Sequence, residues 1–294
     1  MKPAPFEYAA PSTLEQAVSL LARHGDGAKI LAGGQSLVPM MNFRLVRPKV
    51  LVDINRIAGL SYIRESNGHL RIGAMTRQRT LEASTLVRQT NGLLIDAVRL
   101  IGHVAIRTRG TVGGSIVHAD PTAELPAVLA ALDGEVRVAG PRGNRTIGWR
   151  DLFVSYFATS LDSTEICEEV VVPKLGPDAG WGFEEFTLRH GDFALVGVAA
   201  IVEADANDRC TAARVAVAGV GPTPVRADGA EAFLIGETLT GAALDEAGRR
   251  VSEHVAPESD LHASVDYRRH LAGTMTVRAL RAAVDRVKQR RKNS

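Results

Sequence analysis

Two Gly-Gly motifs in closely similar surroundings constrain the fold of this chain more than any other feature. They are Ala32–Ser36 (AGGQS) and Thr111–Ser115 (TVGGS), and each follows a short apolar stretch. Glycine adopts positive φ angles without steric cost and lets a ligand approach main-chain N–H groups. Successive N–H groups that point into one concavity bind anions, so a pyrophosphate is a natural occupant of two such loops. The hydroxyl groups of Ser36, Thr111 and Ser115 would add further donors.

The glycine pairs leave a second interpretation open. The chain contains 28 glycines, and a single Gly-Gly pair is more often an ordinary tight turn than a ligand-binding loop. The likeness of the two motifs makes the pyrophosphate interpretation as good as the tight-turn interpretation. Spacing and composition do not decide between them.

Several common nucleotide, hydrolase and metal motifs are absent. No G-x-G-x-x-G follows the first expected strand, and no G-x-x-x-x-G-K-[ST] occurs, which argues against Rossmann and P-loop sites. No G-x-S-x-G, H-E-x-x-H or paired-cysteine zinc motif occurs either. The two cysteines, Cys167 and Cys210, cannot supply the four ligands of an iron–sulfur cluster. His118 and Asp120 could form a metal pair, but we predict that Asp120 caps a helix beginning at Pro121. We therefore expect no metal site.

Size and charge narrow the class of protein. A chain of 294 residues suggests two domains, and its 45% hydrophobic content suits a globular protein with an ample core. The net charge of +2 predicts no nucleic-acid partner, and the basic segment 286–292 is interpreted as a solvated helix end. No apolar run approaches the roughly 20 residues of a membrane span. No signal segment is recognised, so we expect a cytoplasmic protein.

The N-terminal part is predicted to mix helices and strands. Ser12 and Glu15 form a capping box before a helix that Gly25 ends, and strands at 28–32 and 50–54 complete a small unit over residues 1–55. The second Gly-Gly pair is expected in a turn. The other expected elements are a strand at 70–72, helices at 80–89, 92–101 and 121–132, a β-hairpin at 135–147 and a strand at 165–172.

A glycine- and proline-rich segment, Lys174–Gly182, marks the expected domain boundary. Strands are predicted beyond it at 182–188, 194–202 and 213–220, followed by helices at 227–235, 242–255 and 274–289. Consecutive strands followed by helices predict an antiparallel α+β domain.

Three strings of the sequence together resemble one family. They are residues 32–55 (AGGQSLVPMMNFRLVRPKVLVDIN), 107–136 (RTRGTVGGSIVHADPTAELPAVLAALDGEV) and 183–200 (FEEFTLRHGDFALVGVAA). In this order they resemble the flavoprotein, or medium, subunit of the molybdenum hydroxylases, which include carbon monoxide dehydrogenase and the xanthine dehydrogenases. The resemblance implies an α+β fold: an FAD-binding domain of the para-cresol methylhydroxylase (PCMH) type at 1–176, with α+β subdomains at about 1–55 and 56–176, and a smaller C-terminal domain of antiparallel sheet and helices at 177–290.

The resemblance also implies which residues bind FAD. The first motif would surround the pyrophosphate and the second would add a further set of contacts. Ile101 and Ile166 would be apolar contacts, and Glu124 an acid that hydrogen-bonds the cofactor, with Asp120 beside it. The complete set is Ile30, Leu31, Ala32, Gly33, Gly34, Gln35, Ser36, Leu37, Ile101, Thr111, Gly113, Gly114, Ser115, Asp120, Glu124 and Ile166.

Three positions depart from the family pattern. Gln35 replaces a more usual histidine but still donates a hydrogen bond, and Ser115 replaces a more usual asparagine and loses one contact. Glu184 stands near a lysine of the animal enzymes, so the role of that lysine is not transferred.

Three further residues have two interpretations each. Arg107 and Arg109 could neutralise phosphate charge, although surface arginines are the favoured interpretation. Phe193 could lie over the flavin or be an ordinary packed strand residue, and the sequence does not decide between these.

The family resemblance implies an electron-transfer role. FAD in this chain would take electrons from a small [2Fe–2S] subunit and pass them to an external acceptor, while a large molybdopterin subunit oxidises the substrate, as a dimer of heterotrimers. Flavin carries the redox chemistry, so no catalytic acid or base is expected here. The alternative is a free-standing PCMH-type flavin oxidoreductase that acts directly on a small substrate.

Overall fold

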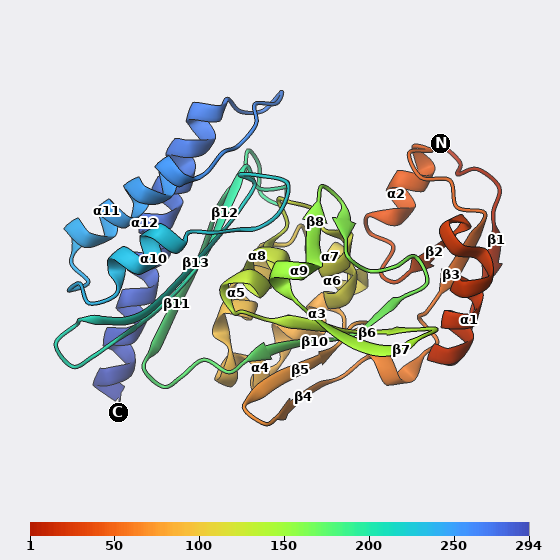
Figure 1. The fold of residues 1–294 in the computed structure, drawn as a ribbon, viewed down its shortest axis with the longest axis horizontal. Coiled ribbons are helices and arrows are strands. Elements are labelled where there is room, and N and C mark those ends of the chain that lie inside the picture. Colours follow the sequence, from red (N-terminus) through yellow and green to blue (C-terminus); the bar gives the residue numbers. More distant parts are fainter. Residues whose placement is uncertain (294) are drawn as a thin grey trace.

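In the computed structural model, which describes residues 1–293, the chain forms three lobes in sequence order (Figure 1). Each lobe is built on its own sheet, and helices pack against every sheet. The predicted α+β fold is confirmed. No helix within the described residues combines the length and the apolar content that a membrane crossing requires.

The first lobe, at the right of Figure 1, holds a small parallel sheet with the order β1-β3-β2. Its helix α1 begins one residue later than predicted, because Thr13 rather than Ser12 is the capping residue. The Thr13 hydroxyl accepts from the N–H of Gln16 at 3.2 Å, and the Gln16 side chain accepts from the N–H of Ser12 at 3.0 Å. The elements are β1 (Glu7–Ala9), α1 (Leu14–His24), a 3-10 turn (Gly25–Gly27), β2 (Ala28–Leu31), α2 (Leu37–Asn42) and β3 (Val50–Asp53).

The second lobe is a five-stranded antiparallel sheet with the order β4-β5-β10-β6-β7. Helices cover the apolar face of this sheet, and α8 is buried along nearly its whole length, as a helix that is apolar on all sides must be. The strands are β4 (Ile63–Ser66), β5 (His69–Gly73), β6 (Glu135–Gly140), β7 (Gly143–Gly148) and β10 (Ile166–Pro173). The helices are a 3-10 turn (Ala58–Leu60), α3 (Gln78–Ala83), α4 (Thr85–Thr90), α5 (Gly92–Leu100), α6 (Val104–Arg109), α7 (Val112–His118), α8 (Glu124–Ala131) and α9 (Trp149–Leu152), which precedes the small hairpin β8 (Phe153–Ser155) and β9 (Ala158–Thr159).

The third lobe is an antiparallel sheet with the order β11-β12-β13-β14. Its longest helix, α12, begins nine residues before the predicted start at Thr274 and packs on β11 and β12. Gly180 and Gly182 allow β11 to pack closely on α12, because a Cβ at either glycine would collide with a carbonyl oxygen of that helix. The elements are β11 (Ala179–Phe186), β12 (Val196–Ala204), β13 (Cys210–Ala218), β14 (Val225–Arg226), α10 (Asp228–Leu234), α11 (Gly241–His254) and α12 (Val265–Asn293).

Two predicted elements differ from the structure near the candidate site. The second Gly-Gly pair lies in the first turn of α7 and not in an open turn, because Thr111 caps that helix. Helix α8 begins at Glu124 instead of Pro121. The carboxylate of Asp120 accepts from the N–H and the hydroxyl of Thr122, at 2.9 and 2.7 Å, so Asp120 closes a turn before the helix and does not cap it.

Trp181 of β11 fastens the third lobe to the second. Its indole N–H donates to Asp96 of α5 at 3.1 Å, and Arg286 of α12 pairs with the same carboxylate at 2.9 Å. The guanidinium groups of Arg286 and Arg290 lie over the ring, 5.0 and 4.9 Å from its centroid. Hydrophobic side chains of both lobes also form one continuous core.

The basic end of α12 is bound to main-chain carbonyl groups rather than solvated alone. Arg290 donates to the carbonyl oxygens of Gly176 and Ala179 at 2.9 and 3.0 Å. Arg291 donates to the carbonyl oxygens of Ala204 and Asp205 at 2.8 and 2.7 Å. The segment between the second and third lobes is therefore held by the far end of the chain.

Replacing Gly92 by alanine tests this interface. A Cβ at Gly92, the first residue of α5, would collide with the Trp181 ring, and overpacking of this kind costs about 1–3 kcal/mol. We expect Gly92→Ala to lower the free energy of unfolding by that amount in chemical denaturation. Gly229→Ala in α10 is the matched control, since its Cβ meets nothing within 4 Å. Equal stability of the two variants would contradict the described contact.

Candidate functional site

The two Gly-Gly motifs meet in the folded chain. A Cβ at Gly33 would lie 2.5 Å from the carbonyl oxygen of Arg109 and 2.9 Å from the Cα of Gly110. A Cβ at Gly114 would lie 3.6 Å from the Cβ of Ala32. The first lobe and the second lobe therefore approach each other at backbone distance here, and glycine at position 33 makes that approach possible.

The first motif forms an open loop between β2 and α2. Gly34 has a φ of +72°, which glycine adopts without strain. The N–H groups of residues 33–36 make no hydrogen bond within the described part of the chain. The Gln35 side chain folds back and donates to the carbonyl oxygen of Gly33 at 3.1 Å. The loop thus offers consecutive free N–H donors of the kind that form an anion nest.

The second motif does not offer such donors. The N–H groups of Val112 and Gly113 donate to the carbonyl oxygens of Thr76 and Ala74 at 3.0 and 2.9 Å. The N–H of Gly114 donates to the Thr111 hydroxyl at 3.2 Å, and that of Ser115 to the Thr111 carbonyl at 3.1 Å. The expectation that this motif also forms a nest of free N–H groups is therefore wrong. Gly113 instead allows close packing of α7 against Ala74, directly after β5.

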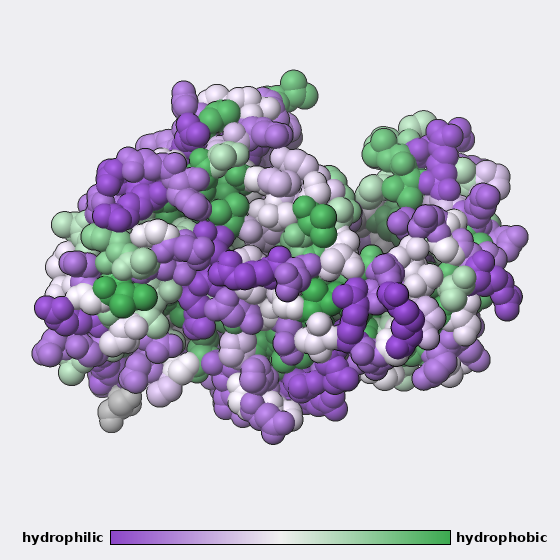
Figure 2. Space-filling model, viewed as in Figure 1, coloured by the Kyte–Doolittle hydropathy of each residue, from purple (hydrophilic) through white to green (hydrophobic). Residues whose placement is uncertain are grey.

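A cavity of about 620 Å³ opens beside the first loop, and the space-filling view shows the surface hollowed between the first lobe and the rest of the chain (Figure 2). Leu31, Val38 and Pro39 give it an apolar side, and Arg77 with the exposed Arg109 gives it a cationic side. The lining residues are Leu31, Ala32, Gly33, Gly34, Gln35, Val38, Pro39, Asp53, Asn55, Arg77 and Arg109. An elongated ligand with phosphate groups suits this combination.

Five of these lining residues were missed in the sequence: Val38, Pro39, Asp53, Asn55 and Arg77. Asp53 and Asn55 end or follow β3, beside β2 in a parallel sheet, and the carboxyl ends of parallel strands are where ligands bind. That signal could have identified them. Arg77 carries no comparable signal, because only the fold brings it to the cavity.

The remaining sequence-predicted residues are not in the lining of this cavity. Thr111 caps α7, and Gly113, Gly114 and Ser115 lie in the first turn of that helix. Ile30, Ser36 and Leu37 flank the lining residues of the first loop. Ile166 is fully buried in the apolar cluster of the first lobe, and Ile101 ends α5 and packs against the core of the second lobe.

Glu124, Asp120 and Glu185 form an acidic group where the second and third lobes meet. Burial, with the nearby charge of Glu185, raises the pKa of Glu124 to about 8. Burial also raises the pKa of Glu185 to about 7, and its Oε2 atom has no hydrogen-bond partner among the described residues. Glu124 therefore holds a proton at neutral pH and can donate a hydrogen bond.

The structure decides between the interpretations of Arg107 and Phe193. Arg107 is not a surface arginine: it is 7% exposed, pairs with Glu82 at 3.1 Å and donates to the carbonyl oxygen of Ile101 at 3.0 Å. Phe193 is not a packed strand residue either, since it is 71% exposed and precedes β12.

Burial lowers the pKa of His118, whose ring lies against Phe157. No group of three or more possible metal ligands occurs within residues 1–293.

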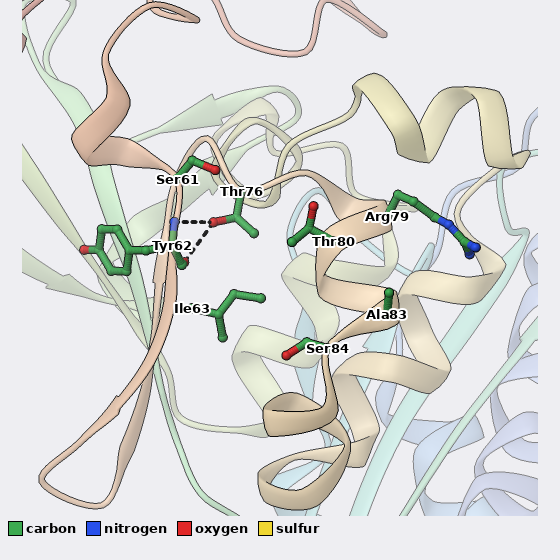
Figure 3. Close-up of a pocket in the computed structure, with 8 residues that line it drawn as sticks. All are labelled: Ser61, Tyr62, Ile63, Thr76, Arg79, Thr80, Ala83 and Ser84. Carbon is green, nitrogen blue, oxygen red and sulfur yellow. Dashed lines mark hydrogen bonds between the residues drawn. The ribbon is translucent and has the colours of Figure 1, made fainter.

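A second cavity of about 590 Å³ lies between β4 and α3 (Figure 3). Hydroxyl side chains dominate its lining, but the Thr76 hydroxyl is already bonded to both main-chain groups of Tyr62, at 2.9 and 3.1 Å. The lining residues are Ser61, Tyr62, Ile63, Thr76, Arg79, Thr80, Ala83 and Ser84. Its one charged side chain, Arg79, is paired with Glu82 at 3.0 Å.

Comparison with known proteins identifies the family. The FAD binding domain in molybdopterin dehydrogenase matches residues 4–175, and the CO dehydrogenase flavoprotein C-terminal domain matches residues 181–283. The 6-hydroxypseudooxynicotine dehydrogenase complex subunit alpha of Paenarthrobacter nicotinovorans is 44% identical over 98% of this chain and 97% of its own length. The carbon monoxide dehydrogenase medium chain of Hydrogenophaga pseudoflava is 38% identical over 96% of this chain and 98% of its own length.

Solved structures agree with these sequence relations. Carbon monoxide dehydrogenase from Hydrogenophaga pseudoflava, in a form that lacks the Mo-pyranopterin moiety, superposes with a TM-score of 0.94 at 38% identity, over 97% of this chain and 99% of that one. Quinoline 2-oxidoreductase from Pseudomonas putida 86 superposes with a TM-score of 0.93 at 35% identity, over 98% and 99%. The chain belongs to the family of FAD-binding medium subunits of the molybdenum hydroxylases, and it is an FAD-dependent oxidoreductase subunit.

Proposed function

We propose that this chain is the electron-transfer subunit of a heteromeric molybdenum hydroxylase. A large molybdopterin subunit oxidises the substrate, a small [2Fe–2S] subunit delivers the electrons, and FAD in this chain passes them to an external acceptor. The proposed assembly is a dimer of heterotrimers in the cytoplasm. Relatives named as subunits of dehydrogenases support a heteromeric assembly. The two cysteines of this chain are buried free thiols, which suit a reducing compartment.

The first glycine loop carries the proposal. The N–H groups of residues 33–36 make no hydrogen bond within the described residues, and Gly33, Gly34 and Gln35 line a cavity that also holds Arg77 and Arg109. Backbone donors and guanidinium groups together are the usual means of holding phosphate oxygens. We assign the FAD pyrophosphate to this loop, with Ile30, Leu31 and Leu37 shaping its two ends.

The second motif acts differently in this proposal. Its N–H groups donate within the protein, so Thr111 and Ser115 contribute through their hydroxyl groups. Gly113 and Gly114, which have no side chains, let the start of α7 lie close enough to contact the cofactor. Ile101 provides an apolar contact, and the fully buried Ile166 supports the site through the cluster that joins the first two lobes.

Glu124 contributes a proton in this proposal. With its pKa raised to about 8, its carboxyl group is neutral at physiological pH and donates a hydrogen bond to the cofactor. Asp120 keeps Glu124 in place indirectly, because it closes the turn that leads into α8. FAD supplies the two-electron chemistry when bound, and the residues of the chain bind and orient it.

Isolation of the chain from its native source tests the proposal. We expect it to co-purify with a molybdopterin-containing chain and an iron–sulfur chain, and its bound FAD to be reduced by substrate only when both partners are present. A lone yellow protein whose flavin is reduced directly by a small substrate would overturn the proposed division of labour in favour of a free-standing oxidoreductase.

Substitution of Gly33 tests the assignment of the first loop. A Cβ at this position would press against the Arg109 carbonyl oxygen and the Gly110 Cα, so Gly33→Ala should push the two lobes apart at the cavity. We expect the dissociation constant for FAD, measured by titration of the FAD-free chain, to rise at least about tenfold, or roughly 1.4 kcal/mol. Gly59→Ala is the control, because its Cβ meets nothing within 4 Å. Unchanged affinity in Gly33→Ala would exclude this assignment.

The pH dependence of FAD binding tests the role of Glu124. The protonated carboxyl group donates and its ionised form does not, so FAD affinity should be highest well below pH 8 and fall as the pH rises through about 8. Glu124→Gln keeps a donor that does not titrate, so its affinity should stay level between pH 6 and about pH 9. Exposed Glu237 provides the control Glu237→Gln, which should retain the fall. If the FAD affinity of the unmodified chain does not change with pH, Glu124 is not the proposed hydrogen-bond donor.

A further inference from the structure

The cavity is built from two lobes whose main contact is apolar. Ala17, Leu21 and Ile54 of the first lobe pack in one cluster with Met75 and Ile166 of the second. Hydrophobic contact is strong but not directional, so this cluster alone leaves the two motifs free to shift relative to each other. A phosphate held between the lobes requires donors at fixed positions.

A directional link between the lobes lies in the cavity itself. The guanidinium of Arg77 donates through Nη2 to the side-chain oxygen of Asn55 at 2.6 Å and through Nη1 to the carbonyl oxygen of Arg109. Within the described residues, this is the side-chain hydrogen bond that connects the first lobe to the second. The Arg109 carbonyl is also the group against which Gly33 packs.

The first-lobe end of this link is itself fixed. The Asn55 side chain donates to the carbonyl oxygen of Ala32, at the start of the first glycine loop, at 2.9 Å. Asp53 accepts from the main-chain N–H of Asn55 at 2.9 Å, and the Tyr8 hydroxyl donates to Asp53 at 2.5 Å. The Asn55 side chain therefore connects the first loop to Arg77 through hydrogen bonds.

The second-lobe end is fixed by the main chain. Arg77 pairs with Thr111 in an isolated antiparallel bridge, and the N–H of Gln78 donates to the carbonyl oxygen of Gly110 at 2.9 Å. The N–H of Val112 donates to the carbonyl oxygen of Thr76 at 3.0 Å. The backbone around Arg77 is thus joined to the second motif, while its side chain reaches the first.

We propose that Arg77 is a positioning residue for dinucleotide binding, which locks the two glycine motifs together so that the first loop and Arg109 face the same pyrophosphate. The inference rests on the proposed function, since the ligand is the pyrophosphate of FAD. Arginine suits this place because its planar fork donates to two separate acceptors at once, which the single ammonium of lysine does less well.

The charges of the cavity agree with an anionic ligand. Arg77 and Arg109 are close enough for their charges to oppose each other, and burial together with the Arg109 charge lowers the pKa of Arg77. Asp53 supplies one compensating carboxylate. Two guanidinium groups against one carboxylate leave a positive charge that a bound phosphate would balance.

Binding of FAD and of ADP to the full-length, FAD-free chain tests the inference. ADP carries the pyrophosphate without the flavin, so Arg77→Met should raise both dissociation constants by the same factor, tenfold or more. Arg77→Lys should show an intermediate increase. Arg88→Met, at an exposed arginine of α4, is the matched control and should change neither constant.

A double substitution separates positioning from general loss of stability. Asn55→Ala breaks the same link from the first lobe, so Asn55→Ala with Arg77→Met should weaken binding by less than the product of the two single effects. Asn55→Ala also tests the link on its own if Arg77→Met does not fold. Thermal unfolding of each variant identifies any change that is only structural.

Each other outcome has a definite meaning. If the unmodified chain binds FAD and the Arg77 and Asn55 variants bind it equally well, the inference fails and the proposed function stands. If Arg77→Met weakens FAD binding but leaves ADP binding unchanged, the inference also fails, because the effect is not at the pyrophosphate. If the unmodified chain binds neither ligand, the proposed function fails and the inference fails with it.

Discussion

The close approach of Gly33 to the backbone of Arg109 and Gly110 is the constraint on which the rest of the site depends. It brings a loop of the first lobe within contact of the start of α7 in the second, and a side chain at position 33 would hold them apart. The parallel sheet of the first lobe positions this loop, since β2 ends at Leu31 directly before it. The cavity, with its free N–H groups and its guanidinium groups, lies beside this contact.

Local sequence signals predicted the fold well because they act over short distances. Alternating and apolar segments located most of the strands, and the α+β arrangement with a C-terminal antiparallel sheet is confirmed. Errors came at element ends. The Thr111 hydroxyl caps α7 and draws the second glycine pair into a helix, which a Gly-Gly pair does not suggest by itself. The short β1, α2 and β4 were missed because they have too few residues to show a period.

The site was predicted only in part, because two of its features depend on long-range contacts. The glycine motifs were visible in the sequence, but their unequal roles were not. Only the fold shows that the carbonyl oxygens of Ala74 and Thr76 accept hydrogen bonds from the N–H groups of the second motif. Arg77 reaches Asn55 across the lobe boundary, and no spacing in the sequence marks that pair. The raised pKa of Glu124 depends first on its burial and then on the charge of Glu185, which comes from a different lobe.

The bound end of α12 has a consequence for the boundary between the two domains. Segment 174–182 has the glycine and proline content of a flexible linker, yet Arg290 of α12 donates to the carbonyl groups of Gly176 and Ala179. The segment is therefore fixed to the helix that closes the third lobe. A rotation of one domain against the other about this segment would have to break these hydrogen bonds, although the sequence alone suggests a hinge.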